Sequence, residues 1–357
     1  MVTIKEIAKR ANVSVGTVDR VINERGRVSK ETEKKVKKII IELNYKPNIL
    51  ARSLSLLKVF QFGVLLPHIS EENHYWELAI KGINRAQSEL EIHKIKVNYF
   101  HYVGYSEESF KETGDKALHN NLDGLLIVPI IYTSIDDEFV KNIPPNLPYA
   151  FFNSVIPNSN EISYIGQDSY QSGILAAQLM HMVVPKSGTI AVITMLHDDY
   201  HINRRLQGFQ FYFESNNRLK IKVYGAHRTE DKFTLDKVID TIFSENIDLQ
   251  GIFVTTALSF RVAEYMLKHK KMKKIKVIGY DLTNENIKYL CQDYIDFLIG
   301  QRPEIQGYQG IYALYRYVVL KEKVERKIMM PLDIITRANI NYYQSYYLGE
   351  QCNYVAS

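Results

Sequence analysis

Cysteine is nearly absent from this 357-residue chain. The only two, Cys291 and Cys352, lie far apart in unrelated surroundings, which argues against a disulfide framework and fits a reducing compartment. The ten histidines are scattered, and no pair has the helical spacing of a metal site among acidic neighbours. We therefore expect no metal and no cofactor.

Glycine is also scarce, and so are the common catalytic motifs. The 18 glycines never cluster into a phosphate-binding loop, and no serine stands in a Gly-x-Ser-x-Gly elbow. Neither cysteine has the histidine context of a catalytic nucleophile. We therefore expect a protein that is not an enzyme.

Long apolar runs are missing as well. No stretch of about 18 apolar residues occurs, and the first residues contain no apolar core of signal-peptide length. These absences predict a cytoplasmic protein with no membrane partner. At 46% hydrophobic residues, the chain can nevertheless bury one or two cores behind a small first domain.

Positive charge is concentrated at the front of the chain. Residues 1–58 contain 14 lysines and arginines against 6 acidic residues, whereas the remainder contains 31 against 34. Each phosphate contact by Lys or Arg releases a condensed counterion, so a basic end favours binding to a polyanion. The alternative interpretation is a solvated charged surface.

The first 43 residues have the pattern of three short helices. Thr3 and Glu6 form a capping-box pair at the first helix, Ser14 can cap the second, and Ser29 can cap the third. Apolar residues recur at helical spacing, at Ile4, Ile7, Ala8 and Ala11, then at Val18, Val21 and Ile22, and then at Val36, Ile39, Ile40 and Leu43. The second helix is then expected to point Val15, Gly16, Thr17, Asp19 and Arg20 outward.

This stretch resembles the LacI family of transcriptional repressors. The match runs through Thr3-Ile4-Lys5-Glu6-Ile7-Ala8, Ala11-Asn12-Val13-Ser14, Thr17-Val18-Asp19-Arg20-Val21-Ile22-Asn23 and Val28-Ser29, and continues at Leu43-Asn44-Tyr45-Lys46-Pro47-Asn48 and Ala51-Arg52-Ser53-Leu54. The resemblance implies a homodimer on a double-stranded, near-palindromic DNA operator, with the second helix in the major groove. The DNA-binding residues expected from it are Thr3, Val15, Gly16, Thr17, Asp19, Arg20, Asn23, Arg27, Asn48, Ala51, Arg52 and Leu54.

For three of these residues, the chemistry of the side chain allows two different contacts. The planar guanidinium of Arg20 suits guanine O6 and N7, and it can also reach a phosphate. Asp19 either accepts a hydrogen bond from cytosine N4 or pairs with a neighbouring arginine. Leu54 either inserts between base steps in the minor groove and kinks the duplex, or packs on the next domain as a linker residue.

From Phe60 onward, buried-strand runs alternate with amphipathic helices, which predicts parallel sheets. The runs fall into two sets, 62–66, 96–100, 124–128 and 149–152, and then 189–193, 219–223, 251–254 and 276–280. We therefore expect an α/β fold with two similar lobes, preceded by the small all-α domain. Ligands in such sheets bind beyond the carboxyl ends of the strands, so the polar residues just after these runs are the candidates.

The body also resembles the periplasmic sugar-binding proteins. The matching pieces are Gly166-Gln167-Asp168 with Gly173, Arg204-Arg205-Leu206-Gln207-Gly208-Phe209, Val277-Ile278-Gly279-Tyr280-Asp281, and Ile299-Gly300-Gln301-Arg302-Pro303 with Gly307-Tyr308. The last piece is more similar to the ribose- and xylose-type binders than to the lactose-type repressors. The expected ligand-binding residues are Asn73, Tyr75, Trp76, Asn153, Asp168, Arg205, Thr256, Asp281 and Gln301.

The resemblance implies that Tyr75 and Trp76 sandwich a sugar ring, that Arg205 and Asp281 bind hydroxyls, and that Gln301 donates from the hinge. Alternatively, Trp76 is a core residue, and Arg205 with Asp281 is a structural ion pair.

Two departures from these binders concern the charge of the site. Asn153-Ser154 stands where they often have Asp-Arg, and Thr256-Ala257 replaces the usual Asn-Asp. The site should therefore be less charged than a typical pentose site. A bulkier or modified sugar, a polyol or a nucleoside stays open as the ligand.

These patterns predict a DNA-binding headpiece at 1–46, a hinge helix and linker at 47–59, a two-lobed ligand-binding and dimerisation domain at 60–341, and a tyrosine-rich tail at 342–357. The tail either caps a lobe or adds to the dimer contact. The function expected is a transcriptional repressor whose operator affinity is controlled by a small-molecule effector of carbohydrate type. The rival hypotheses are a solute-binding module for transport and a sugar-acting enzyme with a DNA-binding front.

Overall fold

The computed structural model describes residues 4–22, 28–43, 58–69, 75–104, 106–130, 134–195, 199–214, 218–226, 233–269 and 275–347. The chain divides into two compact units, Met1–Leu57 and Lys58–Ser357. Several expected contact residues lie outside the described ranges, namely Thr3, Asn23, Arg27, Asn48, Ala51, Arg52, Leu54 and Asn73. The expected hinge helix lies outside them as well.

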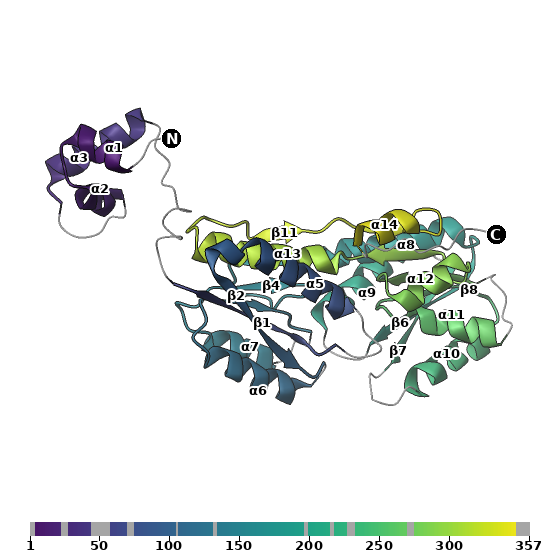
Figure 1. Ribbon diagram of the computed structural model, residues 1–357. Helices are drawn as coiled ribbons and strands as arrows, with labels where there is room; N and C mark the ends of the chain where they lie inside the picture. The colour runs from purple at the N-terminus through teal and green to yellow at the C-terminus, as the bar shows by residue number, and fades with distance from the viewer. Residues whose placement is uncertain are drawn as a thin grey trace. The chain divides into compact units, whose positions relative to one another are not determined.

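The described residues of the first unit form the helices α1 (Ile4–Ala11), α2 (Val15–Ile22) and α3 (Lys30–Glu42) (Figure 1). The expected caps of α2 and α3 are present, because Ser14 Oγ accepts from the Thr17 amide at 3.1 Å and Ser29 Oγ accepts from the Thr32 amide at 3.2 Å. The buried side chains come from all three helices and are those the periodicity predicted, namely Ile7, Ala8, Ala11, Val18, Val21 and Val36.

The first lobe of the second unit is built on a six-stranded sheet in the order β11-β5-β4-β3-β1-β2. Its strands are β1 (Phe60–Pro67), β2 (Ile95–Tyr102), β3 (Gly124–Ile127), β4 (Tyr149–Phe152), β5 (Ser163–Gly166) and β11 (Lys327–Met329). Helices α5 (Tyr75–Glu89) and α13 (Pro303–Val318) cover one face, and α6 (Glu107–Leu118) and α7 (Ser134–Asn142) cover the other (Figure 1). A short 3₁₀ turn (Glu91–His93) leads into β2.

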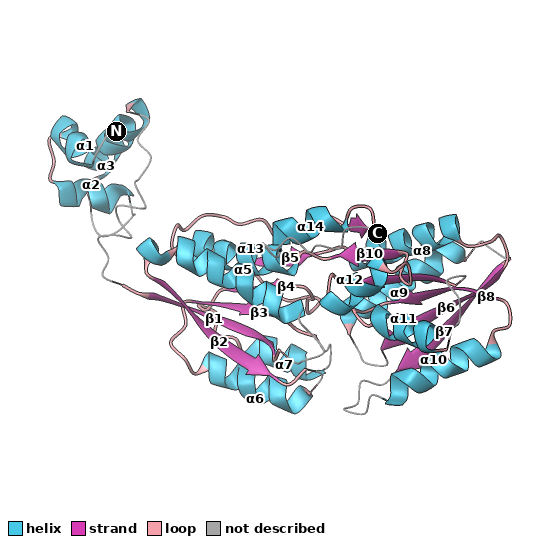
Figure 2. Cartoon of the chain, turned by 45° about the vertical axis from the view of Figure 1, so that its right-hand side comes forward, coloured by secondary structure: helices cyan, strands magenta, loops and turns pink. Residues whose placement is uncertain are grey.

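The second lobe has the sheet order β12-β10-β9-β8-β6-β7 (Figure 2). Its strands are β6 (Gly188–Met195), β7 (Leu219–Ala226), β8 (Leu249–Val254), β9 (Lys276–Tyr280), β10 (Phe297–Gly300) and β12 (Asp333–Ile335). Helices α8 (Ser169–Val183) and α9 (Tyr200–Phe213) pack on one face. The other face carries α10 (Phe233–Glu245), α11 (Ser259–Lys268), α12 (Asn284–Cys291) and α14 (Ile340–Tyr347).

All eight expected strands are present, and the two-lobed α/β prediction is confirmed. Four short strands, β5, β10, β11 and β12, were not predicted. The eight expected strands pair in parallel, as predicted, whereas the edge strand β12, which was not predicted, pairs antiparallel with β10. A short return strand can pair in either direction at an edge, since only one neighbour constrains it.

The chain crosses between the lobes three times, after β5, after β10, and between β11 and β12. Gln167, in the first crossing, is buried, and its Nε2 donates to the Gly300 carbonyl and to the Pro331 carbonyl, both at 2.7 Å. One side chain thus joins all three crossings, which positions the strand ends of the two lobes against each other.

Helix α14 begins before the expected tail and runs into it. Tyr343 packs against the core of the second lobe, whereas Tyr342 is exposed. At the start of the tyrosine-rich segment, Tyr343 therefore packs on the chain's own lobe.

Candidate functional site

A cleft of about 70 Å³ lies where the two lobes meet. It is lined by Tyr75, Trp76, Ile130, Asn153, Met195, His201, Ile202, Arg205, Thr256, Ala257, Leu258, Asp281 and Gln301. Seven residues predicted from the sequence are brought together here, namely Tyr75, Trp76, Asn153, Arg205, Thr256, Asp281 and Gln301. They come from both lobes and from one crossing.

The local fold explains why these side chains converge. Asn153, Thr256, Asp281 and Gln301 follow the strands β4, β8, β9 and β10, and the carboxyl ends of parallel strands form one edge of each sheet. Asn153 and Asp281 both adopt the left-handed backbone region, with φ of 68° and 70°. Asn and Asp tolerate that conformation better than other residues with a side chain, and such strain concentrates at functional sites.

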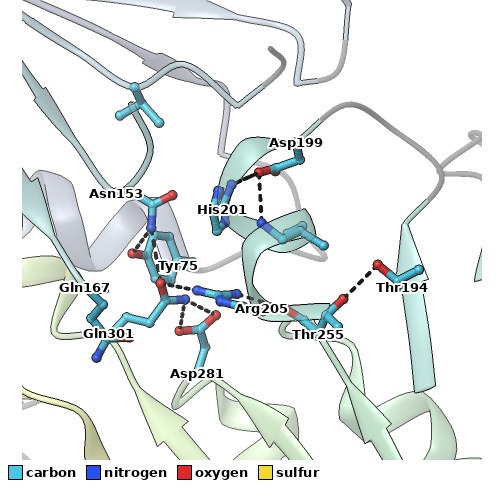
Figure 3. A network of polar contacts seen from close by, with 12 residues as sticks. Tyr75, Asn153, Gln167, Thr194, Asp199, His201, Arg205, Thr255, Asp281 and Gln301 are labelled. Atoms are coloured by element: carbon cyan, nitrogen blue, oxygen red, sulfur yellow. Dashed lines mark hydrogen bonds and ion pairs between the residues drawn. The ribbon is translucent and has the colours of Figure 1, made fainter. Parts of the chain in front are cut away.

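Arg205, from α9, is the most buried charged residue of the cleft, at 2% exposure. Its Nη1 donates to the Thr255 carbonyl at 2.9 Å, and its Nη2 donates to Gln301 Oε1 at 2.6 Å (Figure 3). The guanidinium carbon lies 3.8 Å from the ring centroid of Tyr280, a cation–π contact. Its Nε is buried without a hydrogen-bond partner, so one donor remains for a guest.

Gln301 connects the groups of the two lobes. Its Nε2 donates to both carboxylate oxygens of Asp281, at 2.8 and 3.0 Å, while its Oε1 accepts from Arg205 and, at 3.4 Å, from Asn153 Nδ2. Asn153 Nδ2 also donates to the Tyr75 hydroxyl at 2.6 Å. We call Tyr75, Asn153, Arg205, Asp281 and Gln301 the polar network (Figure 3).

The alternative of a direct Arg205–Asp281 ion pair is not what the structure shows. No contact within 4.0 Å joins the two charged groups, although both are fully described, and Gln301 bridges them instead. Burial raises the pKa of Asp281 to about 6, and the nearby charge of Arg205 and the hydrogen bonds from Gln301 oppose that rise. Burial, and then the charge of Asp281, also raises the pKa of the Tyr75 hydroxyl.

Tyr75 and Trp76 are both buried and both line the cleft, but they do not form two facing walls. Their ring centroids are 4.8 Å apart with an interplanar angle of 85°, so the rings meet edge to face. Trp76 also meets Phe152 edge-on at 6.2 Å. The expected sandwich of a sugar ring between them is therefore absent, and Trp76 serves the core and the cleft together.

Asp168 is not brought to the cleft. It is exposed, and its side chain accepts from the Gln171 amide at 3.0 Å, which makes it the N-cap of α8. The buried polar side chain at this crossing is Gln167, whose sequence signal was only its place in the Gly-Gln-Asp match.

His201 is the main lining residue that the sequence analysis missed. Its Nδ1 lies 2.6 Å from Asp199 Oδ1, in close contact although the ring is not aligned for a good hydrogen bond. Asp199 is fully buried and caps α9 through the amides of His201 and Ile202. The spacing of four residues between His201 and Arg205 on one helix was the available signal, since it places both on the same face.

The cleft is lined by one positive side chain, Arg205, and one negative side chain, Asp281. An ionic guest would therefore leave a net charge in a buried site, which is costly. Hydroxyl groups, which both donate and accept, fit the orphan donor of Arg205 and the oxygen atoms of Asp281 and Asn153. The cleft is thus suited to an uncharged, polar molecule with several hydroxyls.

The raised pKa of Asp281 makes a prediction about stability. The folded chain binds this proton more tightly than the unfolded chain, so the free energy of unfolding should fall as pH rises from about 4 to about 6, and stay constant above that. Each pKa unit corresponds to about 1.4 kcal/mol, so the loss should be about 3 kcal/mol. Urea unfolding of the wild type and Asp281→Asn across pH 4 to 7 measures it. Parallel pH curves for the two proteins would contradict the assignment.

The face of α2 that the sequence predicted to point outward does so. Val15 is 45% exposed, and Gly16, Asp19 and Arg20 are exposed, while Thr17 is half-buried and hydrogen-bonded to Ser14.

Within the described ranges, no cluster of three or more histidine, cysteine or acidic side chains could hold a metal ion. Nor does any described helix have both the length and the apolar character needed to cross a membrane.

Known families match both units. The periplasmic binding protein domain matches residues 62–323, and the lacI family of bacterial regulatory proteins matches residues 3–48. The sucrose operon repressor of Lactococcus lactis is 28% identical over 286 residues, covering 79% of this chain and 84% of that protein. The xylose/arabinose-binding protein XylF of Sulfolobus acidocaldarius is 25% identical over 251 residues, which are 64% of this chain and only 60% of XylF.

A solved structure is also similar to this chain. A Bacteroides fragilis protein described as a LacI transcriptional regulator superposes with a TM-score of 0.75 and 26% identity, covering 80% of this chain and all of that one. The headpiece helices, the two-lobed unit with its cleft, and matches in both parts lead to one conclusion. The chain belongs to the lacI family of bacterial regulatory proteins and carries a periplasmic binding protein domain.

Proposed function

We propose that this regulator binds an uncharged, polyhydroxylated ligand the size of a monosaccharide in the cleft, and that binding there changes the affinity of the headpiece for its operator. The observation that supports this most directly is the polar network, in which Tyr75 and Asn153 of one lobe and Arg205 and Asp281 of the other meet through Gln301. A guest that contacts both lobes stabilises one relative placement of them, and such a difference in affinity between two states is what a ligand switch requires.

The chemistry of the cleft favours a sugar or a polyol. The network offers donors and acceptors in alternation, and the buried rings of Tyr75 and Trp76 provide apolar surface beside them. Two relatives, a sucrose operon repressor and a xylose/arabinose-binding protein, have names that point to the same class of molecule. The opposite charges of Arg205 and Asp281 disfavour sugar phosphates and sugar acids.

A thermal-shift screen tests the ligand class. Monosaccharides, polyols, nucleosides and sugar phosphates are added to the full chain, because a ligand that binds only the folded state raises the midpoint of unfolding. A ligand at one hundred times its Kd stabilises the chain by about 2.7 kcal/mol. We expect an uncharged sugar or polyol to raise the melting temperature, and a response confined to phosphorylated or acidic sugars would contradict the proposal.

For the headpiece, we propose that a homodimer places two copies of α2 in the major groove of a near-palindromic operator in the cytoplasm. The exposed face formed by Val15, Gly16, Asp19 and Arg20 supports it, since it carries an apolar contact for a thymine methyl and a guanidinium for guanine. The 14 basic residues of the first 58 supply the phosphate contacts.

Arg20→Ala should weaken binding to a selected operator by about 5- to 150-fold, the cost of one bidentate contact to guanine. The operator is obtained by selection from random duplexes, and affinity is measured by fluorescence anisotropy at several salt concentrations. An equal loss on all sequences would instead identify Arg20 as a phosphate contact. Wild-type protein that binds no duplex even at low salt would favour the rival solute-binding module.

A further inference from the structure

A second cavity lies beside the cleft, at the crossing that follows β10. It measures about 250 Å³, against about 70 Å³ for the cleft. We call it the hinge cavity, and it is lined by Tyr75, Glu77, Leu78, Lys81, Asp281, Leu282, Thr283, Asn284, Ile287, Gly300, Gln301, Arg302, Pro303, Glu304, Asp333 and Tyr343. An engineered cavity of about 150 Å³ in another protein holds benzene, so the hinge cavity is large enough for a substituted ring.

Apart from Asp281, which accepts two hydrogen bonds from Gln301, the charged groups around the hinge cavity are already in opposite pairs. Arg302 Nη2 lies 2.8 Å from Asp333 Oδ1, and Glu304 is bound by Arg85 at 2.7 Å. Glu77 and Lys81 form an exposed pair at 3.7 Å. An ionic guest would have to compete with these contacts, so it gains little from them.

The remaining surface is largely apolar. Leu78 comes from the first turns of α5, Leu282 and Ile287 come from the β9–α12 region, and Pro303 begins α13. These side chains belong to both lobes, so a guest in the hinge cavity contacts apolar groups of each lobe. Burial of such apolar surface stabilises a guest by about 25 cal/mol per Å².

We propose that the hinge cavity is a second small-molecule site, which takes an uncharged, ring-sized amphipathic ligand and is coupled to the cleft. The coupling follows from three side chains that line both spaces, Tyr75, Asp281 and Gln301. A guest in the hinge cavity restricts Gln301 and Asp281, whose positions the polar network needs. By linkage, each ligand must change the affinity of the other by the same factor.

The binding test uses benzyl alcohol as the uncharged probe and benzylamine and benzoate as charged probes of equal size. Ligand-observed NMR on the full chain should show saturable binding of benzyl alcohol at millimolar concentration, with at least 5-fold weaker binding of both charged probes. Equal binding of all three would overturn the proposal.

Leu78→Trp places a larger side chain in the hinge cavity and should abolish benzyl alcohol binding. The matched control is Leu267→Trp on α11, where Leu267 is also part-exposed but lies outside both spaces. If Leu78→Trp binds the probe as the wild type does, or if Leu267→Trp loses it as well, the cavity is not the site. A melting temperature for each variant confirms that it is folded.

The coupling test rests on the proposed function, because it needs a sugar or polyol identified by the thermal-shift screen. Saturating benzyl alcohol should change the affinity for that ligand by 5-fold or more in the wild type and in Leu267→Trp, but not in Leu78→Trp. If no sugar or polyol raised the melting temperature in the screen, the proposed function would be contradicted, but the binding of benzyl alcohol to the hinge cavity would not be affected. Probe binding without any change in ligand affinity would overturn the coupling alone.

Discussion

Replacing Arg205 by alanine is expected to lower effector affinity by at least about 100-fold while leaving operator binding without effector unchanged. The side chain donates one hydrogen bond to Gln301 within the polar network and one to the Thr255 carbonyl, and its Nε has no protein partner. Hydrogen bonds to charged groups contribute about 1.5–3 kcal/mol each. The loss of one ligand contact, together with the lost positioning of Gln301, therefore accounts for a loss of effector affinity of about 100-fold.

The same substitution should also destabilise the chain. Arg205 is the charge that offsets the burial of Asp281, and without it the pKa of Asp281 should rise further. Arg205→Lys keeps the charge but cannot reproduce the two-pronged contact to Thr255 and Gln301, so we expect it to restore part of the stability and little of the ligand affinity.

The adjacent residue provides the control. Arg204 is half-exposed, lies over the ring of Tyr170 at 4.6 Å and donates to Gln207 at 2.7 Å, away from the cleft. Arg204→Ala should leave effector binding, measured by isothermal titration, within about 2-fold of the wild type, since surface changes are small. If Arg205→Ala still responds to the effector at wild-type concentrations, the cleft is not the effector site.

Gly173→Ala should be among the most destabilising single-methyl changes in the second lobe. A Cβ at Gly173 would lie 2.0 Å from the carbonyl oxygen of Arg205, and one at Gly208 would lie 2.0 Å from that of Tyr170. Helices α8 and α9 therefore approach each other through paired glycines. Because the obstacle is backbone, the helices must separate, at a cost of about 3 kcal/mol or more.

This substitution also tests how the fold positions the site. Displacement of α9 moves Arg205, so effector affinity should fall together with stability in urea unfolding. Gly16→Ala is the comparison, because its Cβ would meet only Ser14 Oγ at 3.8 Å, and alanine there should stabilise the helix by about 0.5–1 kcal/mol. Wild-type stability in Gly173→Ala would show that α8 and α9 are not held at this distance.

The headpiece and the long strands were predictable because their signals are local. Caps such as Ser29, whose Oγ accepts from the Thr32 amide, and apolar repeats within one helix involve residues three or four positions apart. The missed strands depend on distant partners instead. β5 pairs with β11 and β10 pairs with β12, in each case across more than 30 residues of chain.

The cleft was predictable as a set of positions but not as an arrangement. Strand ends of parallel sheets identified Asn153 and Asp281, whereas Asp168, which follows β5, turned out to be a helix cap. The alternation of strand and helix segments in the sequence could not show that the rings of Tyr75 and Trp76 meet edge to face. Nor could it show that Gln301 lies between Arg205 and Asp281.

The amino-acid sequence by itself determined the order of the elements, the two lobes, the exposed side of α2 and most of the polar residues that meet in the cleft. Those features follow from hydrophobic periodicity and capping, which act between near neighbours. Only the tertiary structure decided the bridging role of Gln301, the raised pKa of Asp281, the glycine contact of α8 with α9 and the hinge cavity. Each depends on side chains that come from different lobes or distant helices, where packing and burial set the distances and the local dielectric.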